Sequence, residues 1–531
     1  MPLSKHINTD QLIAQSRDDR ALSLVQRAQG ENARSYTSRY TQKPLPKYTM
    51  PQEGLDEDTA YQLIHDELSG DSTPFLNLAS FVTTRMPRRA QDLYIENINK
   101  NLADQDQYHS SFELQNRVVS MTADLWKAPS SSSAIGTVVA GSSEGLLMSV
   151  LAMKKTWQNK VKNEGTRSFK EPGPNMIFGS EAHCCVEKAA RYFDIEARIV
   201  PITKESGYVM SPSSVSALCD ENTIGVVAIA GSTYTGHVED VLGLNSVLDK
   251  LQEEKGLDIP IHVDAASGGF VLPFAFPNHR WAFDVPRVVS INSSGHKYGG
   301  VYVGAGLVVW RNENFLPHEL IFELHYLGNT ELSFTLNFSK PSNPVIALYF
   351  NFINLGYQGY AKLLQNDFSN ARILARALEA SGYFEVLSDN HRLDDTVRVT
   401  DKTLAEAYIP SLPVVAFRWT DKFKAEHPYL EQKWVQILMK MKGWILPNYP
   451  MSKDLEDIEI IRVVLREELS CEDMLDVLVK DLIEVQEQLT DDTSDYAKLA
   501  LASSGKKPAL KEKEKEKGKT DDRHQGYSRP C

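Results

Sequence analysis

Short apolar runs alternate with amphipathic stretches through much of the chain. Strand-like runs rich in β-branched residues are predicted at 135–140, 175–179, 197–201, 224–230 and 259–263. Helical patterns are predicted between them at 146–158, 182–192, 213–218 and 240–254. Strands that alternate with helices predict an α/β fold, with a mostly parallel sheet that carries helices on both faces.

The pattern changes after Gly356. Helices are predicted at 360–380, 430–442 and 471–488, and strands at 384–387, 413–419 and 458–465. This mixture predicts a smaller α+β domain beside the first. We therefore divide the chain into a flexible arm (1–55), a large domain (56–356), a small domain (357–490) and a disordered tail (491–531). The arm is polar, and the tail is poor in apolar residues and alternates in charge.

Two stretches near the start of the large domain also have helical periodicity. One covers 59–68, and the other covers 113–127. In the second, Leu114, Val118, Met121 and Leu125 recur at helical spacing, which predicts an apolar face that packs into the core.

Two predicted strands end in residues with reactive side chains. Lys297 lies on the connection between the apolar runs 286–291 and 301–310, and Asp264 follows the run 259–263. A single loop lysine is most simply a solvated residue. An amine and a carboxylate at neighbouring strand ends, however, are the two groups that pyridoxal 5′-phosphate requires, one for a Schiff base and one for the pyridine nitrogen.

The segment Gly141–Gly145 reads GSSEG and leads from a predicted strand into a predicted helix. Free amides at the start of a helix, together with two hydroxyl groups, can bind a phosphate. An ordinary serine-capped helix is the alternative interpretation. Cofactors of open α/β folds lie at the carboxyl ends of the strands. The candidate residues near such ends are Ser142, Ser143, His183, Thr233, Asp264 and Lys297.

Several dispersed motifs resemble one protein family. The segments SINSSGHKYG (290–299) and HVDAASGGF (262–270) are similar to the cofactor region of the pyridoxal-phosphate-dependent group II amino-acid decarboxylases, and most of all to the glutamate decarboxylase family of plants, fungi and bacteria. Further matches are NLASFVTT (77–84), NINKNLAD (97–104), TYTGH (233–237), TLNFSKP (335–341) and IIRVVLREE (460–468). Several motifs in family order are more specific than any one of them.

The resemblance implies an aspartate aminotransferase-like fold of type I, pyridoxal 5′-phosphate as cofactor, and α-decarboxylation of L-glutamate to 4-aminobutanoate and carbon dioxide. The implied catalytic residues are Lys297, Asp264, His183 and the proton donor Tyr326. The implied cofactor contacts also include Ser142, Ser143, Thr233, Ala266, Ser294, His296 and, from a neighbouring chain, Ser339. The implied substrate contacts are Ser80, Phe81 and Arg462, with Asn101 and Asp104 across a dimer interface. A homodimer or higher homo-oligomer is therefore expected.

The chain departs from the family pattern at four places. Arg85–Arg88 replaces a more acidic stretch, Gly145 replaces an alanine, and Tyr108–His109 replaces Tyr-Pro. His183 stands where close relatives have glutamine, and a lone histidine could equally be a core or surface residue. Most of these departures are expected to flank the substrate, so aspartate, cysteine sulfinate or an aromatic amino acid remains an alternative substrate. A paralogue that keeps the fold without catalysis is a further alternative. For Arg462, a structural salt bridge is the alternative role.

Charge and composition exclude other classes. The formal net charge of −13 argues against a general nucleic-acid binder, which needs a basic face. The five cysteines have neither a disulfide framework nor metal-ligand spacing, so we expect a reducing compartment and no metal site. No secretory signal and no apolar stretch of about 18 residues is visible, which predicts a cytoplasmic protein without a membrane span. Some plant relatives carry a calmodulin-binding tail, but the tail here has no tryptophan-bearing basic helix, so no such partner is expected.

Overall fold

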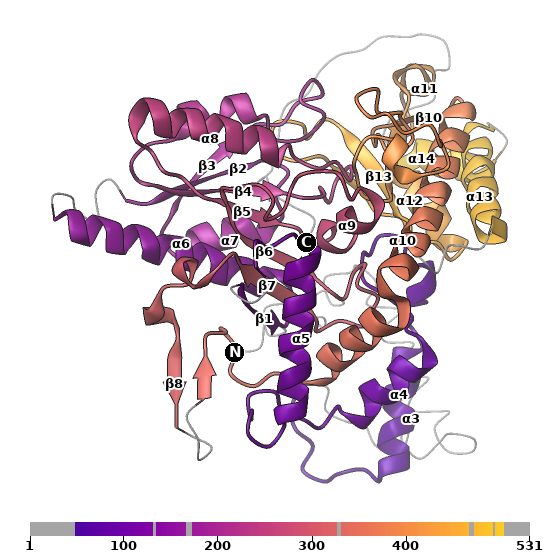
Figure 1. Ribbon diagram of the computed structural model, residues 1–531. Coiled ribbons are helices and arrows are strands. Elements are labelled where there is room, and N and C mark those ends of the chain that lie inside the picture. Colours follow the sequence, from indigo (N-terminus) through magenta and orange to yellow (C-terminus); the bar gives the residue numbers. More distant parts are fainter. Residues whose placement is uncertain are drawn as a thin grey trace. The chain divides into compact units, whose positions relative to one another are not determined.

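The computed structural model (Figure 1) describes residues 48–130, 134–165, 173–325, 331–466, 472–491 and 494–503. The chain divides into two compact units, Met1–Thr73 and Pro74–Cys531. The described part of the first unit contains the helix α3 (Glu57–Leu68). Its first turn is capped by Asp56, whose side chain accepts a hydrogen bond from the backbone amide of Thr59 at 3.0 Å.

The second unit is built on a seven-stranded sheet in the order β1-β7-β6-β5-β4-β2-β3. The strands are β1 (Ile135–Val139), β2 (Asn175–Gly179), β3 (Glu196–Val200), β4 (Thr223–Ile229), β5 (Ile261–Asp264), β6 (Val288–Ser294) and β7 (Gly306–Trp310). Strands β3, β2, β4, β5 and β6 are parallel, as the alternating pattern predicted. Strand β7 is antiparallel to β1 and β6. The link from β6 to β7 contains no crossover helix, and a short link of this kind can only reverse the chain direction.

Helices cover both faces of this sheet (Figure 1). On one face, α6 (Ser142–Glu164) and α7 (Cys184–Tyr192) pack against Met176 and Phe178 of β2. On the other face, α5 (His109–Leu125) and α8 (Val241–Lys255) share a core with Ile177 of the same strand. Neighbouring residues of β2 therefore point to opposite cores, as the period of two in a strand requires.

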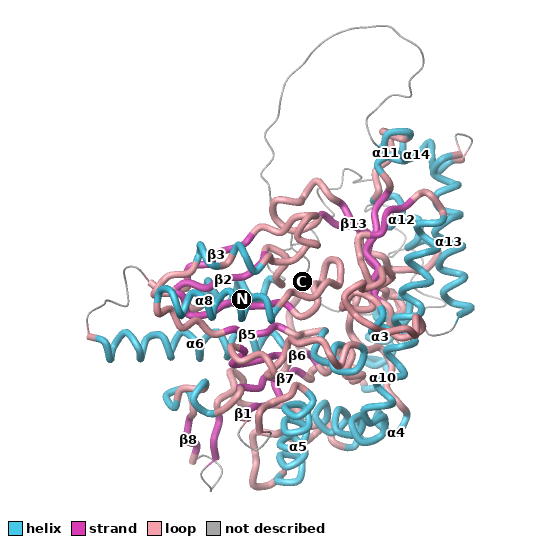
Figure 2. The backbone as a smooth tube through the Cα atoms, turned by 45° about the horizontal axis from the view of Figure 1, so that its top comes forward, coloured by secondary structure: helices cyan, strands magenta, loops and turns pink. Residues whose placement is uncertain are grey.

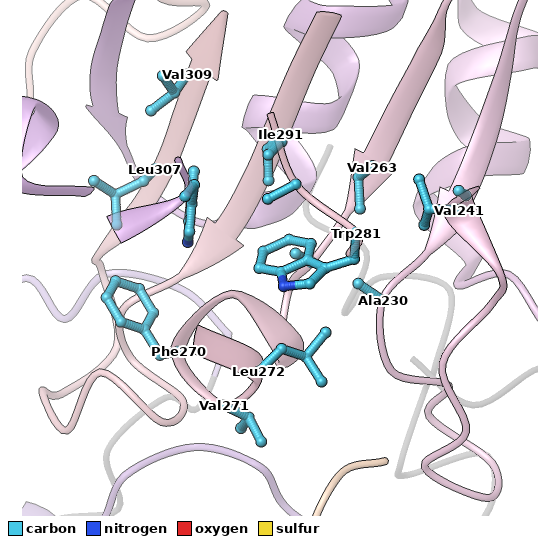
Figure 3. Close-up of a cluster of buried hydrophobic side chains, with 14 of the residues drawn as sticks. Ala230, Val241, Val263, Phe270, Val271, Leu272, Trp281, Ile291, Leu307 and Val309 are labelled. Atoms are coloured by element: carbon cyan, nitrogen blue, oxygen red, sulfur yellow. The ribbon is translucent and has the colours of Figure 1, made fainter. Parts of the chain in front are cut away.

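Figure 3 shows the second of these cores at its centre. Val263, Ile291 and Val309 from three adjacent strands face Leu272 and Trp281, which belong to the segment after β5. That segment includes the short helix α9 (Leu272–Ala275). All five side chains are at most 3% exposed, and full burial of such a side chain contributes about 1.5–3 kcal/mol. This core holds the carboxyl ends of β5 and β6 in place.

The long helix α10 (Asn343–Ala380) leads from the large sheet to the smaller one (Figure 2). It is broken at Gly356, where φ is 60° and ψ is −175°. Only glycine adopts this backbone conformation without strain. The predicted boundary between the large and small domains therefore coincides with a break inside one helix, and both parts belong to a single compact unit.

The smaller sheet has four antiparallel strands in the order β10-β11-β13-β12. They are β10 (Phe384–Val386), β11 (Val414–Trp419), β13 (Glu459–Val464) and the unpredicted β12 (Asn448–Pro450). The second half of α10, α11 (Asp421–Glu426), α12 (Lys433–Met441), α13 (Glu472–Thr490) and α14 (Asp495–Ser503) complete this α+β part. The sequence pattern also missed α4 (Arg88–Glu96), β8 (Phe322–Leu324) and β9 (Glu331–Ser333).

Three local predictions are wrong. The helix expected at 213–218 is a pair of 3₁₀ turns, because so short a segment cannot stabilise a full α-helix. The tail is not disordered from residue 491, because α14 packs Ala497 and Ala500 into the interior. In α5, Met121 of the predicted apolar face is 42% exposed, whereas Val118 of that face is buried together with Val119 and Ala123. The arm before residue 48 and the tail after residue 503 lie outside the described residues.

Candidate active site

A cavity of about 330 Å³ lies at the carboxyl ends of β4, β5 and β6, beside the first turn of α6. This is the edge at which open α/β sheets bind cofactors. The predicted residues that line it are Ser80, Phe81, Ser142, Ser143, His183, Thr233, Asp264, Ala266, Ser294, His296, Lys297 and Arg462. The fold therefore brings together side chains from both ends of the second unit.

Lys297 lies just after β6 and directs its amine into this cavity. Its Nζ lies 3.2 Å from the hydroxyl oxygen of Ser267 and 5.2 Å from the centre of the Phe81 ring. Burial lowers the pKa of Lys297 below that of a free lysine, and the nearby Asp264 carboxylate partly opposes this shift. The lowered pKa increases the fraction of neutral amine, which is the nucleophilic form.

Asp264 is the last residue of β5 and is 5% exposed. Its Oδ1 accepts hydrogen bonds from the side-chain amide of Asn292 at 2.8 Å and from the backbone amide of Ala266 at 3.1 Å. Both bonds engage the same carboxylate oxygen. The second oxygen, Oδ2, is therefore the one available to a ligand in the cavity.

The first turn of α6 provides a site for an anion. Ser142 and Ser143 begin the helix, and the Ser142 backbone amide lies 3.4 Å from the Ser294 hydroxyl. Beside Gly141, the residue that precedes this turn, the buried Nδ1 of His296 has no hydrogen-bond partner among the described residues. Burial, and then the charge of Lys297, lower the pKa of His296 to about 4, so its ring is neutral near pH 7. Amides at a helix start and an unpaired ring nitrogen fit a phosphate group.

His183 caps the start of α7. Its Nδ1 accepts a hydrogen bond from the backbone amide of Cys185 at 3.2 Å, which leaves the proton on Nε2. Burial lowers the pKa of His183, so the cavity wall contains a flat, neutral ring at this position. Such a ring can stack against a planar ligand.

Arg462 enters the cavity from β13. Its guanidinium donates to the backbone carbonyls of Thr233, at 2.6 Å, and Ala79, and its Nε has no partner among the described residues. The group also lies 4.8 Å from the centre of the Phe81 ring. Within the described residues no carboxylate pairs with it, which does not support the alternative of a structural salt bridge. Arg462 is a cation held in place by neutral groups, and it can bind the carboxylate of a ligand.

Comparison with known proteins agrees with this arrangement. Residues 36–394 match the model of the pyridoxal-dependent decarboxylase conserved domain. The chain belongs to this family. The glutamate decarboxylase of Solanum lycopersicum is 43% identical over 457 residues, which span 86% of this chain and 85% of that protein. The glutamate decarboxylase of Saccharomyces cerevisiae is 42% identical over 478 residues, which span 86% and 81%.

A solved structure shows the same fold. The glutamate decarboxylase of Lactobacillus brevis superimposes with a TM-score of 0.78 at 33% identity, covering 86% of this chain and 97% of that one. These matches confirm the predicted family, the α/β fold class, the decarboxylase class of enzyme and pyridoxal 5′-phosphate as cofactor. The cavity of this pyridoxal-dependent decarboxylase fits that cofactor, because it contains an amine, a buried carboxylate and an anion site.

Three predicted residues lie elsewhere, and a fourth is not described. Asn101 and Ser339 contact each other, with 3.2 Å between the Asn101 amide nitrogen and the Ser339 hydroxyl, but neither lines the cavity. Asp104 accepts a hydrogen bond from the backbone amide of Gln107 at 3.2 Å and also lies outside the cavity. Tyr326 lies outside the described residues. The roles predicted for the first three residues require a second copy of the chain.

Sequence reasoning missed several residues of the site. Cys185 and Ser267 line the cavity, and burial raises the pKa of the Cys185 thiol far above its usual value. Asn292 binds Asp264, although we had read it only as part of the family motif. The sequence contained no signal for this contact, because Asn292 lies within β6 and the contact depends on which strands are adjacent.

The departure at Gly145 lies where α6 packs against the large sheet, and Gly145 does not line the cavity. A Cβ atom at this position would meet Val308 Cβ at 3.0 Å and Asn292 Cβ at 3.2 Å. Gly145 therefore allows α6 to approach β6 and β7 closely. Arg85, from another departure, lines a separate smaller cavity together with Thr83 and Lys297.

In the part of the chain that the structure describes, no helix is long and apolar enough to cross a membrane. Among the same residues, no three histidine, cysteine, aspartate or glutamate side chains are grouped so that they could hold a metal ion.

Proposed function

We propose that this enzyme removes the α-carboxylate of L-glutamate as carbon dioxide and leaves 4-aminobutanoate. The names of the relatives in tomato, yeast and Lactobacillus brevis support glutamate as the substrate. The observation that carries the proposal is the shared cavity of Lys297, Asp264 and Arg462. It combines an amine, an acid and a carboxylate-binding cation, which are the three groups that a cofactor-dependent amino-acid decarboxylase needs.

In this proposal each side chain has a separate task. Arg462 binds a substrate carboxylate and fixes the direction in which the substrate enters. Asp264 keeps a proton on the pyridine nitrogen, and Lys297 provides the amine that holds the cofactor aldehyde. Ser142, Ser143, Ser294 and His296 bind the phosphate, and Thr233 and Ala266 border the ring. When bound, pyridoxal 5′-phosphate provides an electron-withdrawing ring that accepts the charge left by the departing carboxylate.

The remaining site residues imply an assembly. Asn101, Asp104 and Ser339 lie outside the cavity of their own chain, so in this proposal they complete the site of a second copy in a homo-oligomer. Tyr326 is the proposed proton donor after carbon dioxide has left. His183 stacks on the ring in place of the glutamine of close relatives. A cytoplasmic location, with its reducing conditions, is part of the same proposal.

The proposal is tested by measuring carbon dioxide and amine release from a panel of amino acids. L-Glutamate should be preferred over aspartate, cysteine sulfinate and aromatic amino acids by at least about 100-fold in kcat/KM, because a mismatch at a charged recognition group leaves buried polar groups unpaired. A preference for another amino acid would show that the substrate assignment is wrong, while the protein would still be an amino-acid decarboxylase. Absence of carbon dioxide from every substrate, with the cofactor bound, would favour the non-catalytic paralogue.

A further inference from the structure

A row of buried polar side chains continues from Asp264 away from the cavity. The Asn292 side-chain amide donates to Asp264 at 2.8 Å, and the carbonyl oxygen of the same amide lies 2.7 Å from Nε2 of His262. The other ring nitrogen of His262 lies 2.8 Å from the Ser290 hydroxyl. His262, Asn292 and Ser290 are all 0% exposed, so water does not complete this network from outside.

The strand register creates the row. Strands β5 and β6 are parallel neighbours, in which His262 pairs with Ser290 and Asp264 pairs with Asn292. Residues two apart in a strand share a face, so the four side chains form a two-by-two block on one side of the sheet. Ser293, between Asn292 and the end of the strand, points to the opposite face.

The donors in this row can point in only one direction. The Asp264 carboxylate only accepts, so Asn292 must turn its NH₂ group toward it and its carbonyl oxygen toward His262. That oxygen needs a donor, which places the His262 proton on Nε2 and leaves Nδ1 to accept from Ser290. Burial lowers the pKa of His262 to about 4, so the ring is neutral near pH 7 and only one tautomer satisfies the row.

We propose that Ser290, His262 and Asn292 are positioning residues that orient Asp264 toward the pyridine nitrogen of the cofactor. The chain of donors holds Oδ1 and leaves Oδ2 facing the cavity. This inference rests on the proposed function of the cavity, but it does not depend on which amino acid is the substrate.

A purely structural role predicts a different result from a positioning role. Buried polar side chains cost stability unless they are satisfied, so loss of one member should destabilise the fold in either case. Only the positioning role predicts that the loss weakens binding of a cofactor that has the ring nitrogen and leaves binding of a cofactor without this nitrogen nearly unchanged. The test therefore compares two cofactors, pyridoxal 5′-phosphate and its 1-deaza analogue, in which a C–H group replaces the ring nitrogen.

The main variant is Asn292→Leu, which has a similar volume and cannot donate. Holoprotein is prepared with each cofactor, and release of the cofactor is followed by absorbance after dilution. The variant should release pyridoxal 5′-phosphate about 10- to 100-fold faster than the wild type, the range expected for a hydrogen bond to a charged group. Release of the 1-deaza analogue should change less than about threefold. The matched control is Ser293→Ala on the opposite face of β6, which should alter neither rate.

A second pair of variants tests the far end of the row. His262→Phe removes the donor that orients Asn292, whereas His262→Gln keeps a donating N–H group. His262→Phe should show the same selective effect, and His262→Gln should recover part of it. The ¹⁵N chemical shift of labelled cofactor should also show a lowered pKa of the ring nitrogen in Asn292→Leu and His262→Phe.

Equal changes with both cofactors, or no change with either, would overturn the positioning role. If Asn292→Leu fails to fold, the release rates of the two cofactors from His262→Phe and His262→Gln test the positioning role in the same way. If the selective effect is present but glutamate is not decarboxylated, the substrate assignment fails and the positioning role stands.

Discussion

Lys297 and Asp264 line the same cavity, although they follow different strands of the large sheet. Burial lowers the pKa of Lys297, and the charge of Asp264 is the largest effect that raises it. In the proposed function, the two side chains contact different atoms of the same cofactor. Each can be changed without removing the other, which allows their contributions to be separated.

Replacing Lys297 by alanine should abolish turnover, by at least about 10³-fold, because no other amine of the cavity can take its place. The cofactor should still bind, though more weakly, through Asp264 and the first turn of α6. Activity and cofactor content are measured on the same sample. Lys154→Met is the control, since Lys154 is another lysine whose pKa is lowered by burial, and it lies on α6 outside the cavity. Full activity of Lys297→Ala would exclude the assigned role.

Asp264→Asn should fold but lower turnover by about 10²–10³-fold, in the range of other preorganised electrostatic groups. Asn292 and the Ala266 amide both donate to Oδ1, so the new side chain must place its oxygen there. Its NH₂ group would then face the pyridine nitrogen and could not keep that atom protonated. Near-normal turnover, measured at saturating cofactor, would mean that the ring nitrogen does not need an acid partner.

Arg462→Lys should raise KM for glutamate by about 10- to 100-fold, because a lysine cannot both hold the Thr233 and Ala79 carbonyls and present a free N–H to the substrate. Arg418→Lys on the adjacent strand β11 is the control, since Arg418 pairs with Glu385 and Asp421 outside the cavity. An unchanged KM for Arg462→Lys would show that another group binds the substrate carboxylate.

The sequence was sufficient to predict where strands of the large sheet end, because a strand end has a simple local pattern. A β-branched run that stops at polar residues or glycine predicts both the strand and the edge of the sheet at which the next residues lie. Lys297, Asp264 and Ser142 lie at the same sheet edge for this reason. Arg462 is different: it comes from the small sheet, and only the family resemblance linked it to the site.

Features that depend on neighbouring elements could not be predicted. The period of α5 is visible in the sequence, but Met121 and Val119 differ in burial because of what packs against the helix. The antiparallel direction of β7 depends on the absence of a crossover, and the Asn292–Asp264 contact depends on which strands are adjacent. A pattern examined one segment at a time contains none of this information. Ser339, Asn101 and Asp104 depend on a second chain, and their roles stay predictions.

Glu181 and Glu239 form a buried pair that should make stability depend on pH. Their side chains are 1% and 0% exposed, and they accept from the backbone amides of Met210 at 2.8 Å and Ile229 at 2.7 Å. The remaining oxygens, Glu181 Oε2 and Glu239 Oε1, have no donor among the described residues. Burial raises the pKa of both carboxyls, and for Glu239 the charge of Glu181 raises it further. We therefore expect the two side chains to share at least one proton.

The direction of this pH dependence follows from the numbers of protons bound by the folded and unfolded chains. Below the ordinary pKa of 4.5, both carboxyls are protonated in the folded and unfolded chains, so the pair has its full stability. At higher pH the unfolded chain loses these protons while the folded chain keeps at least one. Stability should then fall by about 1.4 kcal/mol per pH unit for each retained proton, until the pH passes the raised pKa.

Glu239→Gln should reduce this loss. The glutamine keeps an oxygen for the Ile229 amide, and its NH₂ group can donate to Glu181, so no shared proton is needed. We expect the free energy of unfolding in urea to fall less between pH 5 and pH 8 for Glu239→Gln than for the wild type. The histidines whose pKa is lowered by burial, such as His262, affect both proteins equally and cancel in the difference. Glu385→Gln at the surface is the control, and curves for Glu239→Gln that run parallel to the wild type would exclude the shared proton.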